Sequence, residues 1–186
     1  MLGISLFAFG LSAFRVLYTD TLYFVFLNWN LFLAFIPWAV TSWISIYPEW
    51  QKKPLLIIIL LALWLLFFPN APYILTDLFH LRLRTSMPVW YDMSMIMGFA
   101  WAGLMFGLLS LRDIEVILKK KIKPVIVKFI SVFLIFLGSF GVYIGRYLRY
   151  NSWDIFRQPE TIISDIGKRV IYPMDHLHTW GMTIVL

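Results

Sequence analysis

The chain has 186 residues, of which 61% are hydrophobic and only 14% charged, with 16 Lys and Arg against 10 Asp and Glu and no Cys. A soluble domain typically carries about 45–50% apolar and about 25% charged residues, so this composition excludes a soluble enzyme. It indicates an integral membrane protein. Without cysteine, the chain has no disulfide, no thiolate nucleophile and no cysteine-bound metal centre.

Charges and prolines divide the chain into apolar stretches, and a helix needs about 20 apolar residues to cross a bilayer. Five stretches are complete and cover residues 2–18, 22–46, 54–68, 91–111 and 124–147. A partial stretch at 178–186 is too short to span, and we expect it to be a truncated sixth helix. The first stretch has no basic start and no cleavage pattern, so we interpret it as a retained helix. The predicted fold is all-α, a polytopic transmembrane helix bundle in a single integral membrane domain over residues 1–186.

Glycines recur at four-residue spacing in the fourth and fifth stretches, as Gly103 with Gly107 and Gly141 with Gly145. Such spacing allows two helix backbones to approach closely. We interpret both pairs as packing positions, because glycine has no side chain that could carry out chemistry.

Lysine and arginine separate to opposite sides of the predicted bundle. The loops around 48–54 and 112–128 hold seven of the eight lysines, whereas the other side holds seven of the eight arginines. Basic residues in short loops mark the cytoplasmic side, so we predict that the lysine-rich loops are cytoplasmic. All three histidines fall on the arginine side. Any functional site is therefore expected on the outer side.

The densest polar segment follows Pro69 and Pro72, which end the third stretch. From residue 73 onward, apolar side chains share one helix face, and the opposite face carries Tyr73, Thr76, Asp77, His80 and Arg84. The segment is too polar to span. We predict an interfacial amphipathic helix whose polar face is turned to the bundle or to lipid head groups.

Asp77 and His80 are the candidate catalytic residues, because a carboxylate three residues before an imidazole can fix its tautomer for acid–base chemistry. Two alternatives remain open. The pair could ligate a metal together with Asp92 and either His176 or His178, or it could simply contact interfacial water. We assign no metal ligand and leave any cofactor undetermined.

Arg146 and Arg149 are predicted to share one helix face near the outer membrane boundary, where paired guanidinium groups suit a phosphate. The alternative is that they only extend toward water at a helix end. The candidate substrate-binding residues are Tyr73, Asp92, Arg146, Arg149, Asn151 and Asp154. We expect the charged members of this set to gather with Asp77 and His80 at one end of the bundle.

Two further expectations concern stability. Arg146 is expected to be replaceable without opening a cavity in the core. Asn28 and Asn30 lie deep in the second stretch, where amide side chains usually form hydrogen bonds between helices.

Five runs of sequence together carry a family resemblance. They are LNWNL at 27–31, FPNAPYILTDLFHL at 68–81, WYD at 90–92, and SFGVYIGR at 139–146 followed by NSWD at 151–154. Over nearly its whole length the chain resembles the bacterial membrane-protein family called domain of unknown function 1361. The resemblance implies a bacterial cell-membrane protein, in a family whose members continue into a last apolar helix. It implies no activity and no functional residue.

The sequence supports two hypotheses of different classes. In the first, the protein is an outer-leaflet enzyme, a hydrolase or transferase acting on a lipid-linked or phosphate-bearing substrate. Asp77 and His80 would then transfer protons, while Arg146 and Arg149 would hold the anionic group. In the second, it is a non-catalytic transporter or assembly partner with an outward-facing polar binding surface. Both hypotheses expect membrane lipids, and no nucleic acid, as partners.

Overall fold

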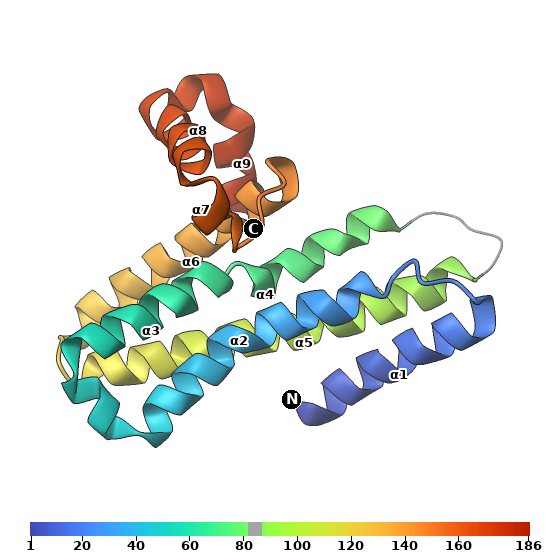
Figure 1. Ribbon diagram of the computed structural model, residues 1–186, viewed down its shortest axis with the longest axis horizontal. Coiled ribbons are helices and arrows are strands. Elements are labelled where there is room, and N and C mark those ends of the chain that lie inside the picture. The colour runs from blue at the N-terminus through green and yellow to red at the C-terminus, as the bar shows by residue number, and fades with distance from the viewer. Residues whose placement is uncertain (82–86) are drawn as a thin grey trace.

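A computed structural model describes residues 1–81 and 87–186, and every regular element in these ranges is a helix. The elongated bundle contains α1 (Leu2–Thr19), α2 (Phe26–Ile46), α3 (Pro54–Phe67), α5 (Val89–Lys119) and α6 (Pro124–Tyr147) (Figure 1). Within the described residues, five helical segments are long and apolar enough to cross a membrane, the third of them running from Pro54 to His80. The predicted all-α transmembrane bundle is confirmed.

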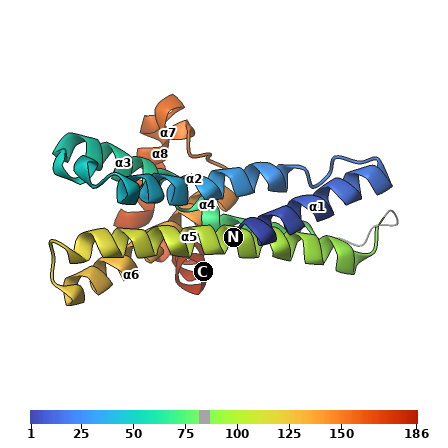
Figure 2. The same cartoon turned by 90° about the horizontal axis from the view of Figure 1, so that it is seen from below.

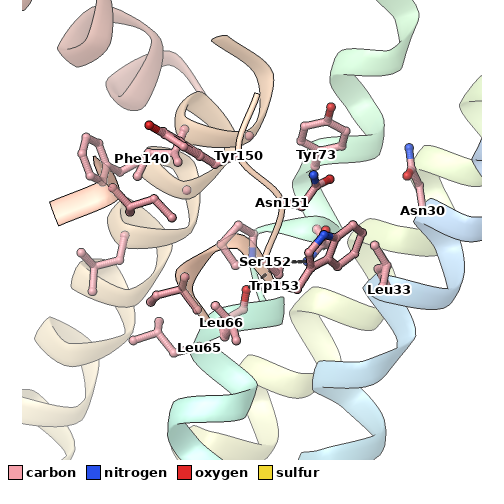
Figure 3. Close-up of a pocket in the computed structure, with 18 of the residues that line it drawn as sticks. Asn30, Leu33, Leu65, Leu66, Tyr73, Phe140, Tyr150, Asn151, Ser152 and Trp153 are labelled. Atoms are coloured by element: carbon pink, nitrogen blue, oxygen red, sulfur yellow. Dashed lines mark hydrogen bonds between the residues drawn. The ribbon is translucent and has the colours of Figure 1, made fainter. Parts of the chain in front are cut away.

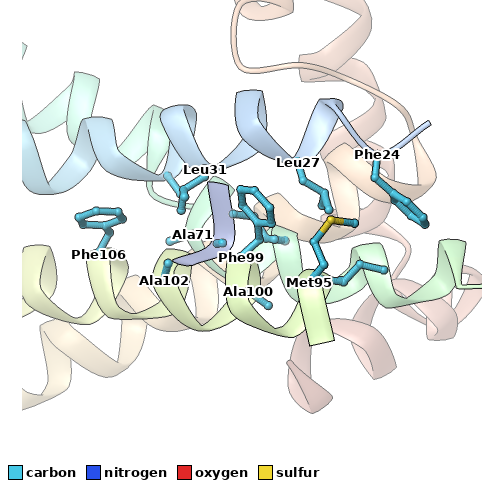
Figure 4. Close-up of a cluster of buried hydrophobic side chains, with 13 residues drawn as sticks. Phe24, Leu27, Leu31, Ala71, Met95, Phe99, Ala100, Ala102 and Phe106 are labelled. Carbon is cyan, nitrogen blue, oxygen red and sulfur yellow. The ribbon is translucent and has the colours of Figure 1, made fainter. Parts of the chain in front are cut away.

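The helices α2 and α5 form the centre of the bundle and run in the same direction (Figures 1 and 2). Phe24, which precedes α2, and Leu27 in its first turn face Met95 and Phe99 of α5 in the main apolar core (Figure 4). Figure 1 shows α3 and α6 along one half of α5, and α1 along the other half. The helix α5 therefore provides the surface on which both halves assemble.

The helix α5 extends beyond the predicted stretch at 91–111, because it covers Val89–Lys119. At 1.5 Å per residue, its 31 residues are about 46 Å long, which exceeds a hydrocarbon core of about 30 Å. A helix satisfies its own backbone hydrogen bonds in water as well as in lipid. The charged residues at 112–119 therefore extend α5 rather than end it.

The two lysine-rich connections lie at the same end of the bundle in both views (Figures 1 and 2). One is the short helix η1 (Pro48–Lys52) between α2 and α3, and the other is the turn between α5 and α6. The link between α1 and α2 lies at the opposite end. This placement of the loops agrees with the predicted order of the spans. That the lysine-rich end faces the cytoplasm stays a prediction.

The amphipathic segment after α3 forms α4 (Asn70–Tyr73) and η2 (Ile74–His80), which continue α3 along the bundle. Its amphipathic pattern predicts a position in the membrane interface. In the structure it packs against α2, α5 and α6, with Ala71, Ile74 and Asp77 buried. The polar face was expected to be turned either to the bundle or to lipid head groups. In the structure it is turned to the bundle.

The two glycine pairs provide the space for this segment. A Cβ atom on Gly107 would lie 2.7 Å from Cβ of Ala71, and one on Gly103 would lie 2.8 Å from Cδ1 of Ile74. On the facing helix α6, Gly141 adjoins the ring of Pro69 in the same way. The packing role predicted for the glycines is confirmed, and their partner is the segment 69–74 rather than another regular transmembrane helix.

The C-terminal part forms α7 (Asp154–Arg157), α8 (Pro159–Ile171), η3 (Pro173–His176) and α9 (Leu177–Val185) beside the end of α6 (Figure 1). The partial apolar stretch at 178–186 corresponds to α9. Its Trp180 stacks on Phe136 and Phe140 of α6, with ring planes 7° and 9° apart. These contacts fix α9 against the bundle.

Candidate functional site

Asp77 is the centre of a buried polar cluster that joins three parts of the fold. Nη2 of Arg146 donates to its Oδ1 at 2.6 Å, and Nδ2 of Asn30 donates to its Oδ2 at 2.9 Å. The side chain of Asp77 is only 1% exposed. A buried carboxylate is costly unless it is paired and hydrogen-bonded. The bonds from α2 and α6 satisfy this requirement.

Arg146 is held by further contacts on the same side of the bundle. Its Nε donates to Oγ1 of Thr76 at 2.8 Å, and its guanidinium carbon lies 4.7 Å from the centre of the Tyr73 ring. An arginine over an aromatic ring gains favourable cation–π energy. The guanidinium group is therefore bound to the protein itself rather than presented to an external anion.

His80 lies beside this cluster without a hydrogen bond to it. Its Nδ1 is 3.7 Å from Oδ1 of Asp77, which is beyond hydrogen-bonding distance, and no described residue bonds to Nδ1. The expected contact between Asp77 and His80 is present at ion-pair distance, while the hydrogen bonds of the carboxylate are made with Arg146 and Asn30. A role of Asp77 in orienting this imidazole stays a prediction.

Asp92 belongs to a separate ion pair between α1 and α5. Nε of Arg15 donates to its Oδ1 at 2.7 Å, and both side chains are 2% exposed. The same guanidinium donates to Thr21 at 3.1 Å and lies over the ring of Phe24. The expectation that Asp92 joins Asp77 and Arg146 in one cluster is therefore wrong. Asp92 pairs with Arg15 of α1 near the start of α5, whereas Arg146 at the end of α6 pairs with Asp77.

Arg149, Asn151 and Asp154 occupy the turn between α6 and α7. Because α6 ends at Tyr147 and Arg149 has a positive φ of 61°, Arg149 does not share a helix face with Arg146 as predicted. Oδ2 of Asp154 accepts hydrogen bonds from the backbone N–H of Asn151 at 2.7 Å and from its Nδ2 at 3.1 Å. Within residues 1–81 and 87–186, Arg149 makes no ion pair or hydrogen bond. The predicted pair of phosphate-binding arginines is therefore not assembled.

The alternative was a metal site. In the described ranges, no three His, Asp or Glu side chains are grouped so that they could hold a metal ion. His178 packs instead against the rings of Tyr143 and Tyr147, at 6.0 and 4.7 Å between centres. Arg82 and Arg84, which the sequence analysis counted on the arginine side, lie outside the described residues.

A cavity of about 490 Å³ opens next to the Asp77 cluster, between α2, the α3–α4 segment, α6 and the residues after Tyr147 (Figure 3). This volume is within the range of small-molecule sites. Its apolar lining comprises Leu33, Leu65, Leu66, Pro69, Leu137, Phe140, Gly141, Ile144, Gly145, Ile155, Ile162 and Ile166. Its aromatic and polar lining comprises Trp29, Asn30, Asn70, Tyr73, Tyr150, Asn151, Ser152 and Trp153. None of these residues is charged.

The polar residues of the cavity lining are interspersed with apolar ones. In Figure 3, Asn30, Tyr73 and Asn151 lie toward one side, which also includes Leu33, and Leu65 and Leu66 lie toward the other. Asn30 and Tyr73 also contact the Asp77–Arg146 ion pair. The buried cluster therefore holds the polar wall of the cavity in place.

Two polar residues form hydrogen bonds between the turn after α6 and the end of α3. Nδ2 of Asn70 donates to the carbonyl of Phe67 at 2.9 Å and to Oγ of Ser152 at 3.2 Å, and Ser152 donates to the carbonyl of Leu66. Neither residue is among the site residues predicted from the sequence. Their pairing across 82 positions leaves no periodic signal in the sequence.

Tyr150 completes the polar lining on the side of α8. Burial raises the pKa of its phenol, and the hydrogen bond that it donates to Oδ2 of Asp165 at 3.0 Å raises this pKa further. The phenol is therefore neutral at physiological pH, and the lining of the cavity stays uncharged.

Comparison with known proteins agrees with the fold and does not supply an activity. The comparisons with curated proteins and with solved structures return no match. A family model described as "Protein of unknown function (DUF1361)" matches residues 29–186, which include the cavity, the Asp77–Arg146 pair and α5 through α9. The chain belongs to this family of unknown function.

Proposed function

We propose that this protein binds a membrane lipid in the cavity beside Asp77 and acts as a non-catalytic component of the membrane. The observation that carries this proposal is a cavity whose lining is largely apolar and includes a few uncharged polar groups (Figure 3). Ligand sites are typically apolar with a few placed polar groups. A lipid has the matching arrangement, with an acyl portion attached to a polar head.

The geometry favours binding over proton transfer. A general acid or base must reach the reacting group of its substrate. Neither Asp77 nor His80 lines the cavity, and both carboxylate oxygens of Asp77 already accept hydrogen bonds from the protein. In this proposal, Asp77 supports the wall of a binding site, and neither Asp77 nor His80 takes part in a reaction.

The test measures lipid binding by protein purified in detergent. After delipidation, adding the ligand lipid at about 100 times its dissociation constant is expected to raise the thermal midpoint by several degrees, since a ligand that binds only the folded state stabilises it. Mass spectrometry of the protein before delipidation identifies the lipid that copurifies. The proposal is contradicted if no lipid copurifies and no membrane lipid shifts the midpoint.

A matched pair of variants localises the lipid. Leu66→Trp places a large ring in the cavity, whereas Leu63→Trp places the same ring on an exposed position of the same helix. We expect only Leu66→Trp to lose the bound lipid. If Leu66→Trp fails to fold, Ile166→Trp supplies a second obstruction from α8. Equal lipid retention by an obstructed variant and by Leu63→Trp would contradict this location.

A further inference from the structure

We infer that the cavity selects a lipid whose head group is uncharged and carries hydroxyl groups, such as a glycosyl diacylglycerol, over one that ends in a phosphate. This inference rests on the lipid binding proposed above and goes on to specify the chemistry of the head group. Its basis is the charge of the lining, the hydrogen-bonding groups left open there, and a carboxylate at the polar side.

The lining offers no cation to a phosphate. Among the described residues that border the cavity, none is a lysine or an arginine. The nearby Arg146 donates to Asp77 and Thr76 and lies against the ring of Tyr73. Because moving a phosphate out of water is costly without a paired cation, the cavity disfavours a phosphate-bearing head.

The open polar groups of the lining include two hydrogen-bond acceptors. The amide nitrogen of Asn30 donates to Asp77, and that of Asn70 donates to Phe67 and Ser152, so the orientation of both amides is fixed by their partners. Within the described part of the chain, no group donates to either side-chain oxygen. An ionised phosphate has only acceptors and would repel these oxygens, whereas a hydroxyl group can donate to them.

Aromatic residues suit the same kind of head group. Trp29, Tyr73, Tyr150 and Trp153 all border the cavity. Each presents an apolar ring with a polar atom at its edge. A sugar or glycerol head has a similar mixture of C–H surface and hydroxyl groups, so it can contact the rings and the amides together.

The charged group that is hydrogen-bonded to the polar lining at Asn151 is a carboxylate, while Arg149 lies in the same turn and Arg157 at the end of α7. Asn151, which lines the cavity there, donates two hydrogen bonds to Asp154, and no described cation lies within ion-pair distance of that carboxylate. A carboxylate that forms no ion pair repels a phosphate placed next to it and has little effect on a neutral head group. This electrostatic preference acts in the same direction as the hydrogen-bonding preference.

The experiment compares lipids that share the same acyl chains and differ in their head groups. Delipidated protein is titrated with a dioleoyl glucosyl diacylglycerol, with dioleoylglycerol and with dioleoyl phosphatidic acid, and bound lipid is counted by native mass spectrometry. We expect the two neutral lipids to bind at least 10-fold more tightly than phosphatidic acid. Leu66→Trp is expected to abolish this binding, and Leu63→Trp to retain it.

The outcomes separate this inference from the proposed function. Phosphatidic acid binding as tightly as the neutral lipids, with sensitivity to Leu66→Trp, would overturn the head-group inference and leave lipid binding in place. Binding of no lipid at all would overturn both. Neutral-lipid binding that Leu66→Trp does not affect would place the lipid elsewhere and also overturn the inference.

A second pair of variants tests the electrostatic step. Asp154→Asn removes the charge and keeps an oxygen acceptor for Asn151, whereas Asp175→Asn removes a charge from an exposed position on η3. We expect Asp154→Asn to narrow the preference for neutral lipid about two- to threefold at low salt, and Asp175→Asn to leave it unchanged. An equal effect of both variants would contradict the role given to this carboxylate.

Discussion

Asp77 and Arg146 are 69 residues apart in the sequence and form an ion pair 2.6 Å long in the structure. The pair connects η2 to the end of α6. Asn30 extends the connection to α2 through the second oxygen of the same carboxylate. One buried charge pair thus fixes the relative positions of the elements that form the polar wall of the cavity.

The first prediction concerns the loss of the cation. Arg146→Met leaves the buried carboxylate of Asp77 without its partner, and we expect the free energy of unfolding to fall by about 3–5 kcal/mol. This differs from the expectation drawn from the sequence, in which Arg146 could be replaced without structural cost. Thermal or denaturant unfolding in detergent measures the change.

The control for this prediction removes both charges. In the double variant Asp77→Asn with Arg146→Met, no unpaired charge remains, so part of the lost stability is expected to return. A double variant that is as unstable as the sum of its two single variants would show that the ion pair does not carry the effect.

The second prediction concerns His80. Its side chain is 39% exposed and makes no hydrogen bond to Asp77. We expect His80→Ala to change the free energy of unfolding by less than about 1 kcal/mol and to leave lipid binding unchanged. Thermal unfolding and lipid titration measure the two effects. Loss of a cellular function in a folded, lipid-binding His80→Ala protein would favour the catalytic hypothesis instead.

The number of spans followed from composition, because a bilayer requires a minimum length and apolarity of every helix that crosses it. The extents did not all follow, since α5 and the third span are longer than predicted. The glycine spacing likewise predicted close packing. The course of the segment after Pro69 was not predictable from its own pattern. An amphipathic helix in the interface and one turned into a bundle have the same periodicity, and only the space at Gly103, Gly107 and Gly141 decides between them.

The pairing of the buried charges was also not predictable from the sequence pattern. Arg15, Asp92, Asp77 and Arg146 all lie near predicted helix ends, so several pairings were compatible with the topology. The lateral order of the helices selects Arg15 with Asp92 and Arg146 with Asp77. That order depends on tertiary packing, which the spacing of residues along one chain does not encode.

The third prediction concerns the glycine contacts. In Gly107→Ala the new Cβ would lie 2.7 Å from Cβ of Ala71, so the segment must shift, and we expect a loss of about 1–3 kcal/mol. The matched control is Gly10→Ala in α1, where nothing lies within 4 Å and alanine favours the helix. Unfolding curves of the two variants test this. Equal stability would contradict the close contact at Ala71.

The fourth prediction concerns the contact between α1 and α2. Nδ2 of Asn28 donates to Oγ of Ser12 at 3.0 Å. Because interhelical hydrogen bonds in membranes contribute modestly, we expect Asn28→Ala to lower stability by about 0.6–2 kcal/mol. Ser12→Ala is expected to lose a similar amount, and the double variant little more than either. Additive losses in this cycle would contradict a shared hydrogen bond.

The fifth prediction concerns the orientation in the membrane. Lys120 follows α5 at the lysine-rich end, and Gln158 lies between α7 and α8 after α6, so the span α6 separates the two positions. Both are exposed, and the natural sequence has no cysteine that would interfere with labelling. A cysteine at Gln158 should react with a membrane-impermeant thiol reagent in intact cells, and a cysteine at Lys120 should react only after permeabilisation, because lysine-rich loops stay in the cytoplasm. The reverse pattern would invert the orientation, and equal labelling of both positions in intact cells would contradict the assignment of α6 as a membrane span.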